Sequence, residues 1–150
     1  MLHDVGKVGI AESILNKSGP LNPDEWESMK RHVEYGAKLL EPLRGTGRIR
    51  EMVAHHHEFF DGSGYPAGLT GTQIPLGARI IAIADAYDTI TSERTYKKAR
   101  TPQEAFLELE RCGGAQFDPE LVRVFVSRLR EMPNPLLVNP VAVQEPEVTR

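Results

Sequence analysis

Several residue types are scarce in this sequence, and each scarcity narrows what the protein can be. There is one cysteine, Cys112, so no internal disulfide can form and a reducing compartment is the simplest setting. No apolar run approaches the roughly 20 residues of a membrane span, and no signal-peptide pattern is visible, so we expect a cytoplasmic protein. The formal net charge is −3, which makes bulk attraction to nucleic acid polymers or anionic membranes unexpected. An anionic ligand would have to be held by a local basic cluster or a metal.

The length and composition fit one globular domain. Apolar residues make up 40% of the 150 residues and charged residues 26%, which are ordinary values for a soluble protein. The apolar periodicity is helical almost throughout and no pair of strands is convincing, so we predict an all-α bundle of about five to seven helices. Residues 1–132 would form the domain. Residues 133–150 carry four prolines and little periodicity, and we interpret them as a disordered tail or linker.

Capping residues and glycines predict where the first helices begin and end. Residues 1–6 have the pattern of the last turn of a helix, ended by Gly6 and Gly9, and residues 10–21 that of a connector with one short turn. In "LNPDEW", Asn22 is a capping residue with Glu25 three positions later, and a helical stripe follows as far as residue 40. We assign this stripe to the core; its members are Trp26, Met29, Val33, Ala37 and Leu40.

A long loop divides the predicted helices. The helix before it spans about 47–58, and the loop over 59–76 carries four glycines and two prolines. Loops longer than about a dozen residues without regular structure are usually functional or disordered. The residues of the preceding helix expected to point inward are Ile49, Met52 and Val53.

Three helices are predicted after the loop. An apolar helix covers residues 76–92, "TPQE" begins the next with Thr101 as its cap and Glu104 completing a capping box, and "DPE" at 118–120 begins the last, which ends near Glu131. We expect one stripe of the helix over 76–92 to face inward, comprising Ile80, Ile83, Ala84, Tyr87 and Thr91.

Histidines and carboxylates concentrate in the first part of the chain. All five histidines lie within the first 57 residues. Neutral imidazole and carboxylate suit first-row divalent metals such as iron, manganese or zinc. Neighbours on a helix point about 100° apart, so the pair His3–Asp4 can serve two adjacent metals with the carboxylate bridging, and the same holds for His56–His57. The remaining two histidines are His32 and His55.

Asp85 is the candidate carboxylate from the second half of the chain. It lies in the apolar stretch "IIAIADAYD", where a buried carboxylate is costly unless it is paired or bound to a metal. The small neighbours Ala84 and Ala86 would let other helices approach. Asp88, one turn later, is the rival candidate.

Each of these residues also has an ordinary structural interpretation. A lone histidine such as His32 is more often structural than a ligand, and His55 could be a solvent-facing extra. The pair His3–Asp4 could cap a helix end, and Asp61 is more typical of a turn residue. The conjunction of a His-Asp pair, an isolated histidine, a His-His pair and a buried aspartate favours a metal cluster over these separate explanations.

Several longer motifs resemble one known family. "HDVGK" at residues 3–7 is similar to the signature of the HD superfamily of metal-dependent phosphohydrolases. "HHEFFDGSGYP" at 56–66, "IADAYDTITSERTYKKA" at 83–99 and "GAQFDPELV" at 114–122 look like its HD-GYP subfamily. The resemblance covers about residues 1–130. It implies a helical bundle with a site for two or three metals, usually iron or manganese, that hydrolyses cyclic di-GMP.

The resemblance implies roles for individual residues. Asp4 would bridge two metals and Lys7 would assist at the phosphate, so these two are the implied catalytic residues. The implied metal ligands are His3, Asp4, His32, His56, His57 and Asp85, with His55 an addition. The implied substrate-binding residues are Lys17, Arg94 and Lys97 at the phosphates and Gly64, Tyr65 and Pro66 in the loop that walls the site. Lys7 and Lys17 could equally be plain surface lysines.

The implied reaction is hydrolysis of cyclic di-GMP to pGpG, GMP or both through a binuclear site and a bridging hydroxide. Two metals roughly 3.5 to 4 Å apart would orient the phosphodiester and activate the nucleophile. Arg94 would grip the second phosphate with paired hydrogen bonds, and Lys97 would add a point charge. The loop at 64–66 could instead dock signalling partners such as diguanylate cyclase domains, and a homodimer is compatible with the sequence.

Two departures from the family pattern matter. The family's domain begins well before the HD pair, with helices that supply a glutamate and another histidine, whereas this sequence starts at Met1. We therefore expect a domain without those helices, which keeps two metals and lacks a third. Val33 stands where the family commonly has proline, which predicts a less sharply bent helix.

Two other functions compete with the phosphodiesterase. The missing helices favour a non-catalytic module that binds the nucleotide or a partner protein. An HD hydrolase with another phosphoester substrate is the third option, against which the "GYP" loop and the pair Arg94/Lys97 weigh. The set of candidate ligands favours the enzyme that acts on cyclic di-GMP.

Overall fold

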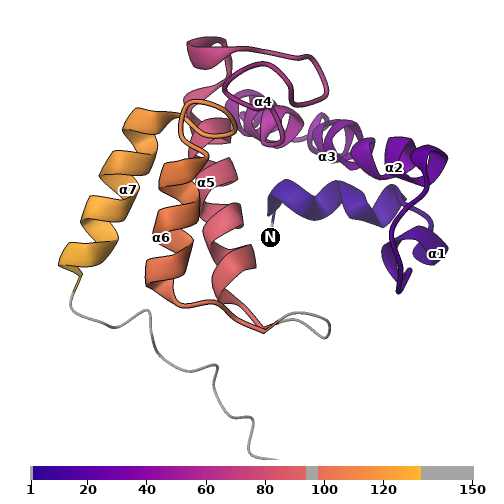
Figure 1. Ribbon diagram of the computed structural model, residues 1–150. Coiled ribbons are helices and arrows are strands. Elements are labelled where there is room, and N and C mark those ends of the chain that lie inside the picture. Colours follow the sequence, from indigo (N-terminus) through magenta and orange to yellow (C-terminus); the bar gives the residue numbers. More distant parts are fainter. Residues whose placement is uncertain (1, 94–97, 133–150) are drawn as a thin grey trace, which may run out of the picture.

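The structure is a computed structural model that describes residues 2–93 and 98–132 (Figure 1). Over these residues it contains helices and no strand, so the predicted all-α fold is confirmed. The elements in chain order are η1 (Leu2–Gly9), α1 (Glu12–Leu15), α2 (Pro23–Lys30), α3 (His32–Leu40), α4 (Gly47–His55), η2 (Gly71–Gln73), α5 (Leu76–Thr91), α6 (Pro102–Arg111) and α7 (Pro119–Glu131), where η marks a 3-10 helix. None of the described helices is long and apolar enough to cross a membrane. The tail predicted over 133–150 lies outside the described residues.

The helices α5, α6 and α7 form one group around the main core (Figure 1). Their apolar faces meet, and the turn before α7 adds an aromatic ring. The buried members of this core are Ile83, Phe106, Leu109, Phe117, Val122 and Val126. Fully burying a side chain of this kind stabilises a fold by about 1.5 to 3 kcal/mol, so this core fixes α5 as a rigid wall.

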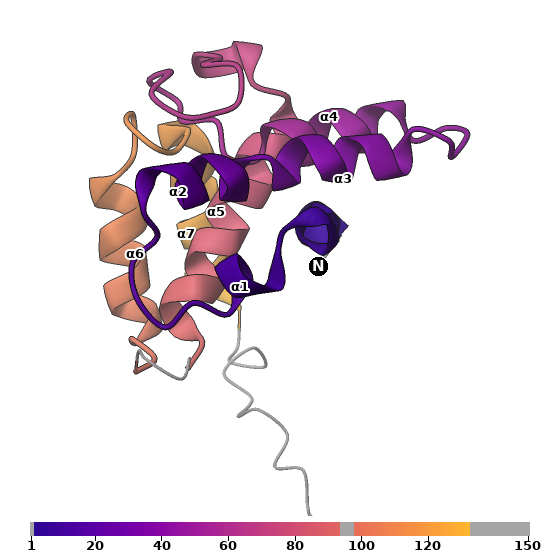
Figure 2. The ribbon, with the colours of Figure 1, turned by 90° about the vertical axis from the view of Figure 1, so that its right-hand side faces the viewer.

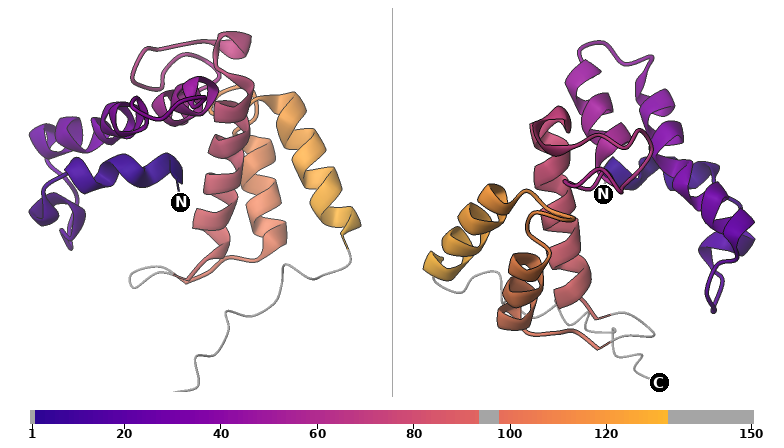
Figure 3. Two further views of the ribbon diagram at one scale, coloured as in Figure 1. Left: turned by 180° about the vertical axis from the view of Figure 1, so that it is seen from behind. Right: turned by 45° about the horizontal axis from the view of Figure 1, so that its top comes forward.

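The second group consists of η1, α3 and α4; η1 packs against α3 and is seen end-on beneath it in Figure 2. The helix α4 also contacts α5, so the two groups share a boundary. Seen from behind, the start of η1 reaches toward the middle of α5 (Figure 3). The first residues of the chain therefore lie between the two groups.

Close backbone approach at Gly6 allows η1 to lie against α3. A Cβ atom at Gly6 would lie 1.9 Å from the carbonyl oxygen of His32 and 2.3 Å from the backbone nitrogen of Gly36. No side chain fits there, so glycine is required for packing. Of the two glycines predicted to end the first helix, Gly6 does not, because η1 continues to Gly9 and ends there.

The predicted helix starts are confirmed by their hydrogen bonds. The side chain of Asn22 accepts from the backbone N–H of Glu25, and the carboxylate of Glu25 accepts in return from the Asn22 N–H. Thr101 and Glu104 form the same reciprocal arrangement at α6. Asp118 caps α7 by accepting two backbone N–H groups. Local sequence decides these positions, since each cap is made within a few residues.

Several inward assignments are wrong. The predicted single helix from Asn22 to residue 40 is divided at Arg31 into α2 and α3. Trp26 is 47% exposed, because α2 lies at the edge of the molecule, where no described helix covers its outer side. On α5, Ile80 is 47% exposed and Ala84 is also exposed, because the core forms on the neighbouring face that carries Ile83. Ile49 on α4 is exposed as well, whereas Val53 is buried as predicted.

Candidate metal centre

Histidine and aspartate side chains from both helical groups converge where the groups meet. His3 and Asp4 lie on η1, and His32 is the first residue of α3. His56 and His57 follow His55, the last residue of α4, which ends three residues before the predicted end at 58. Asp85 lies in the middle of α5. These residues are the six candidate ligands of the sequence analysis, brought together from four segments of the chain.

The distances within this cluster are short. The imidazole rings of His56 and His57 have centroids 4.1 Å apart, and those of His3 and His56 are 4.9 Å apart. The rings of His32 and His57 lie 5.1 Å apart. The Nε2 atom of His3 is 3.5 Å from a carboxylate oxygen of Asp4 and 3.5 Å from one of Asp85.

Three of these imidazoles leave a buried nitrogen without a partner. The Nε2 atoms of His3, His32 and His56 are buried and make no hydrogen bond within the described part of the chain. The Nδ1 atoms of His32 and His56 each lie 2.8 Å from a backbone carbonyl oxygen, of Met29 and Val53 respectively. A carbonyl only accepts, so Nδ1 carries the proton and Nε2 presents a lone pair. A metal-binding histidine is typically oriented in this way by its second nitrogen.

The donor atoms fall into two overlapping groups. His32, His56 and His57 form one, and His3, Asp4 and His56 form the other, with the donor atoms of each group within 4.8 Å of one another. The groups share His56. This donor set of imidazole nitrogen and carboxylate oxygen fits first-row divalent cations.

The electrostatics of the cluster favour metal-binding protonation states. Burial lowers the pKa of His56 to about 4 and that of His57 to about 3, and burial also lowers the pKa of His32. These three imidazoles are therefore neutral at pH 7, as ligation requires. Burial alone would raise the pKa of Asp4, but the hydrogen bond and charge of Lys7, with smaller contributions from nearby histidines, hold it below its ordinary value.

Lys7 places a cation at the edge of the cluster. Its Nζ atom donates to a carboxylate oxygen of Asp4 at 2.9 Å, one turn along η1. The side chain of Lys7 is 43% exposed, so the ammonium group lies where the cluster opens to solvent. A charge at that position can interact with an anion that approaches the cluster.

The loop after the histidine pair forms one wall of the cluster. The ring of Tyr65 stacks on His57, with centroids 5.0 Å apart and planes 28° apart. The edge of Trp26 meets the Tyr65 ring from α2, and Lys30 lies over the same ring. Burial, together with the charge of Asp4, raises the pKa of Tyr65 to about 12, so its hydroxyl stays protonated.

Glu58 holds this loop in place, a role that the sequence analysis did not assign. Its side chain is buried, and its two carboxylate oxygens accept from the backbone N–H groups of Ala67 at 2.7 Å and Leu69 at 3.1 Å. The side chain of His55 approaches the same carboxylate at 3.4 Å and does not belong to the cluster. Asp61 is a turn residue as predicted, since it accepts from the backbone N–H of Ser63.

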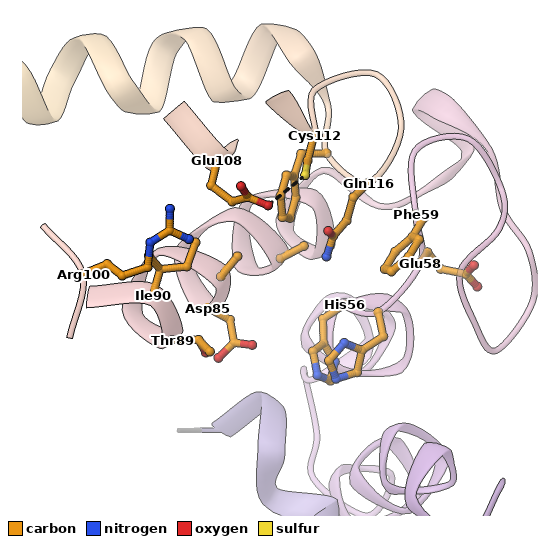
Figure 4. Close-up of a pocket in the computed structure, with 14 residues that line it drawn as sticks. His56, Glu58, Phe59, Asp85, Thr89, Ile90, Arg100, Glu108, Cys112 and Gln116 are labelled. Atoms are coloured by element: carbon orange, nitrogen blue, oxygen red, sulfur yellow. Dashed lines mark hydrogen bonds between the residues drawn. The ribbon is translucent and has the colours of Figure 1, made fainter. Parts of the chain in front are cut away.

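A cavity of about 350 Å³ extends from the cluster between α5 and α6 (Figure 4). His56, His57 and Asp85 of the cluster line it, and its other polar lining residues include Arg100, Glu108 and Gln116. Asp85 was expected to be buried, but its side chain is 31% exposed because it faces this cavity. Arg100 and Gln116 were not singled out from the sequence, since neither belongs to a recognisable pattern of ligand residues.

The remaining predicted site residues differ in what they contact. Lys17 forms an ion pair with Glu25 rather than with a cluster residue. Gly64 packs closely on the backbone of residues 57–59, and a Cβ atom there would lie 2.2 Å from the backbone nitrogen of Phe59. Pro66 is exposed beside it. Arg94 and Lys97 lie outside the described residues. Asp88, the rival of Asp85, is exposed and accepts from the hydroxyl of Ser92.

The arrangement described above matches a known family. A family model described as an HD domain matches residues 1–121. The chain belongs to the HD-domain family. Within it, the tripeptide Gly64-Tyr65-Pro66 and the curated relatives place the chain in the HD-GYP group, as the sequence resemblance predicted.

Curated relatives and a solved structure support this assignment. A cyclic di-GMP phosphodiesterase of Thermotoga maritima is 42% identical over 135 residues, and 3'3'-cGAMP-specific phosphodiesterase 2 of Vibrio cholerae serotype O1 is 44% identical over 134 residues. Each match covers 87% of this chain, but only 36% and 25% of the respective relative. The crystal structure of a cyclic GMP-AMP specific phosphodiesterase of V. cholerae is similar with a TM-score of 0.67 at 25% identity, covering 88% of this chain and 36% of that one. The chain thus spans about a third or less of these proteins.

Proposed function

We propose that this domain is a metal-dependent phosphodiesterase that hydrolyses cyclic di-GMP to pGpG, GMP or both. One observation supports this most strongly: three buried, unpartnered histidine Nε2 atoms lie close to Asp4, and His56, which carries one of them, lines the cavity. An imidazole cluster without a ligand would leave these polar atoms buried and unpaired, which costs free energy. The names of the relatives support a cyclic dinucleotide as the substrate.

The residues that would hold two divalent metals, iron or manganese, are those of the overlapping groups. The residues that would hold them are His3, Asp4, His32, His56, His57 and Asp85. Bound divalent cations supply Lewis-acid polarisation of a phosphoryl oxygen and lower the pKa of bound water. A third metal is not part of this proposal, because these six side chains provide ligands for two.

The chain's own side chains would bind and orient the substrate. Lys7 would neutralise negative charge on the phosphoryl group beside Asp4, because its ammonium group is exposed at the opening of the cluster. Arg94 and Lys97 would contact the second phosphate. Tyr65 would shield His57 from water on the loop side, and Lys17, with Gly64 and Pro66, would lie at the outer rim. The same loop is the surface we propose for signalling partners such as diguanylate cyclase domains.

A non-catalytic module remains the second candidate. The chain spans 36% or less of the curated relatives named above, so elements that complete an active site in those proteins can be absent from this chain. Such a module would bind a cyclic dinucleotide or a partner without hydrolysis. Metal content and turnover separate the two functions.

The test is turnover of cyclic di-GMP by the purified chain after addition of manganese or ferrous iron. The proposal predicts linear product with the wild type and none with Asp4→Ala. Asp85→Ala should also abolish turnover, and Asp88→Ala is the matched control because its carboxylate lies one turn further along α5 and is exposed. Turnover by metal-free Asp4→Ala protein would contradict the mechanism, and tight binding of cyclic di-GMP without turnover would favour the module.

A further inference from the structure

The end of the cavity remote from the metal cluster carries its own set of polar groups. Arg100 and Glu108 line this part, and Figure 4 shows their side chains across the cavity from His56. The space between is bounded by apolar residues, among them Phe59, Ile90 and Phe117. A cavity with aromatic and aliphatic walls and a few convergent polar groups suits a planar heterocycle.

The backbone holds this end in a defined position. The N–H of Arg100 donates to the carbonyl oxygen of Ile90 at 3.0 Å, which ties the segment before α6 to the end of α5. The N–H of Phe60 donates to the carbonyl oxygen of Gln116 at 3.2 Å, which ties the loop that carries Tyr65 to the turn before α7. The groups at the far end are therefore fixed relative to the metal cluster.

Arg100 and Glu108 offer opposite hydrogen-bonding capacities side by side. Arg100 forms no ion pair with any carboxylate in residues 2–93 or 98–132, so its guanidinium donors remain available. Glu108 pairs with Arg111 at 2.6 Å, and its second oxygen accepts from the same guanidinium at 3.2 Å. The hydrogen bond from Arg111, with a smaller contribution from the charge of Arg100, keeps the pKa of Glu108 below its ordinary value. A guanidinium donor thus lines the same cavity as a carboxylate that is ionised at pH 7.

Guanine matches this combination and adenine does not. Guanine presents the acceptors O6 and N7 on one edge, which an arginine contacts in bidentate fashion, and the donors N1–H and N2–H₂ on the adjoining edge, which a carboxylate accepts. Adenine places an amino donor where guanine has O6, and it has an acceptor at N1. With adenine, N7 would still accept from the guanidinium, but the guanidinium N–H that pairs with O6 would face the amino donor and the carboxylate would face the acceptor N1.

We propose that this end of the cavity is a guanine-binding subsite, in which Arg100 contacts O6 and N7 and Glu108 accepts from N1–H and N2–H₂. The inference rests on the proposed phosphodiesterase function and adds to it the base that the site selects. It makes Arg100 a specificity-determining residue. It also fixes which phosphodiester of a mixed dinucleotide reaches the metal cluster, since the guanine must occupy this subsite.

The test compares cyclic di-GMP, 3'3'-cGAMP and cyclic di-AMP as substrates in the presence of manganese. The wild type should cleave cyclic di-GMP with a kcat/KM at least about 100-fold above that for cyclic di-AMP, given two hydrogen-bonded groups of this strength. It should open only one of the two phosphodiester bonds of 3'3'-cGAMP. Arg100→Met should lower kcat/KM for cyclic di-GMP roughly 10- to 100-fold, leave cyclic di-AMP nearly unchanged and give both linear products from 3'3'-cGAMP.

Lys98→Met is the matched control. It also removes one positive charge, but Lys98 lies two residues before Arg100, is exposed and does not line the cavity. It should leave the ratio between cyclic di-GMP and cyclic di-AMP unchanged. If Arg100→Met lowers kcat/KM by the same factor for all three substrates, Arg100 contacts a phosphate and the proposed guanine subsite is overturned. Equal cleavage of cyclic di-GMP and cyclic di-AMP by the wild type would overturn it as well.

Binding of GMP and AMP to the same protein separates failure of the subsite from failure of the proposed function. The wild type should bind GMP about tenfold or more tightly than AMP, and Arg100→Met should abolish this preference. That result supports the subsite even if no cyclic dinucleotide is cleaved, in which case only the proposed function fails. Cleavage of cyclic dinucleotides without a preference for GMP over AMP would contradict the subsite but not the proposed function. A protein that neither cleaves a cyclic dinucleotide nor prefers GMP would contradict both the subsite and the proposed function.

Discussion

The ring of Tyr65 stacks on the imidazole of His57, with centroids 5.0 Å and planes 28° apart. This contact joins the glycine-rich loop to the metal-binding cluster, because His57 belongs to one of the two groups of candidate ligands. The loop is held from the other side by Glu58, the residue next to His57, whose carboxylate accepts from the N–H groups of Ala67 and Leu69. The orientation of a ligand and the shape of the loop are therefore linked.

Replacing Tyr65 tests this link. Tyr65→Ala should weaken manganese binding and turnover by about 10-fold or more, because residues that orient a metal ligand typically have effects of this size. Tyr65→Phe keeps the stacked ring and should bind manganese with nearly the wild-type affinity. Calorimetric titration with manganese measures the affinity of each metal-free variant. Equal affinities for the alanine and phenylalanine variants would show that the stack does not position His57.

Glu58→Gln tests whether the buried carboxylate organises the loop. The substitution keeps the shape but loses the negative charge and one acceptor oxygen facing two backbone N–H groups, so the free energy of unfolding should fall by about 1 to 3 kcal/mol. Asp61→Asn is the control, since Asp61 is an exposed turn carboxylate in the same loop. Urea unfolding of both variants measures the difference, and a Glu58→Gln protein as stable as Asp61→Asn would contradict the role given to Glu58.

Gly6→Ala tests the close approach of η1 to α3. The added methyl group would overlap the carbonyl oxygen of His32, so we expect a loss of about 2 to 3 kcal/mol in the free energy of unfolding, together with weaker metal binding as His3 and Asp4 are displaced. Gly19→Ala is the matched control, because a Cβ atom there would meet nothing within 4 Å. It should change stability by about 0.5 kcal/mol or less. Similar stabilities for the two variants would show that the η1–α3 contact is not tight.

The depressed pKa values predict how stability depends on pH. Burial lowers the pKa of His56 to about 4 in the folded, metal-free protein, whereas the unfolded chain protonates near the ordinary value of about 6.5. The unfolded state therefore binds more protons between these values, and stability falls as the pH decreases through 6.5 toward 4. For His56 alone the loss between pH 7.5 and 5.5 is about 1 kcal/mol.

Urea unfolding of the metal-free protein at several pH values measures this slope. His56→Asn removes the titrating group, so its free energy of unfolding should decrease less steeply over the same pH range, whatever its absolute stability. An identical slope for the wild type and the variant would show that His56 titrates normally in the folded protein.

The sequence predicted the parts of the fold that depend on local interactions. The caps at Asn22, Thr101 and Asp118 each form within a few residues, and the sequence pattern located all three. Which face of a helix is buried depends on the helix packed against it, and the sequence pattern did not predict this correctly. Trp26 has the spacing of a core residue, yet it packs edge-on against Tyr65 and stays about half exposed, because no helix among residues 2–93 and 98–132 covers α2 on that side.

In the candidate site, too, some residues could be predicted from the sequence and others depend on the folded structure. Histidine and aspartate are costly to bury without partners, so their occurrence in apolar segments was a signal that the sequence carried. The apolar context and the family resemblance favoured Asp85 over Asp88, and the structure places Asp85 beside His3 and leaves Asp88 exposed. Glu58 and Arg100 could not be assigned in advance, because their partners are backbone groups and a cavity formed only by the folded chain.

The central claim is that the clustered histidines and aspartates bind a pair of divalent cations. Titration of the metal-free protein with manganese, followed by elemental analysis after removal of free metal, measures this directly. The account predicts about two ions per chain for the wild type and the loss of at least one with Asp4→Ala or His56→Ala. A wild-type chain that retains no metal, or variants that retain as much as the wild type, would contradict it.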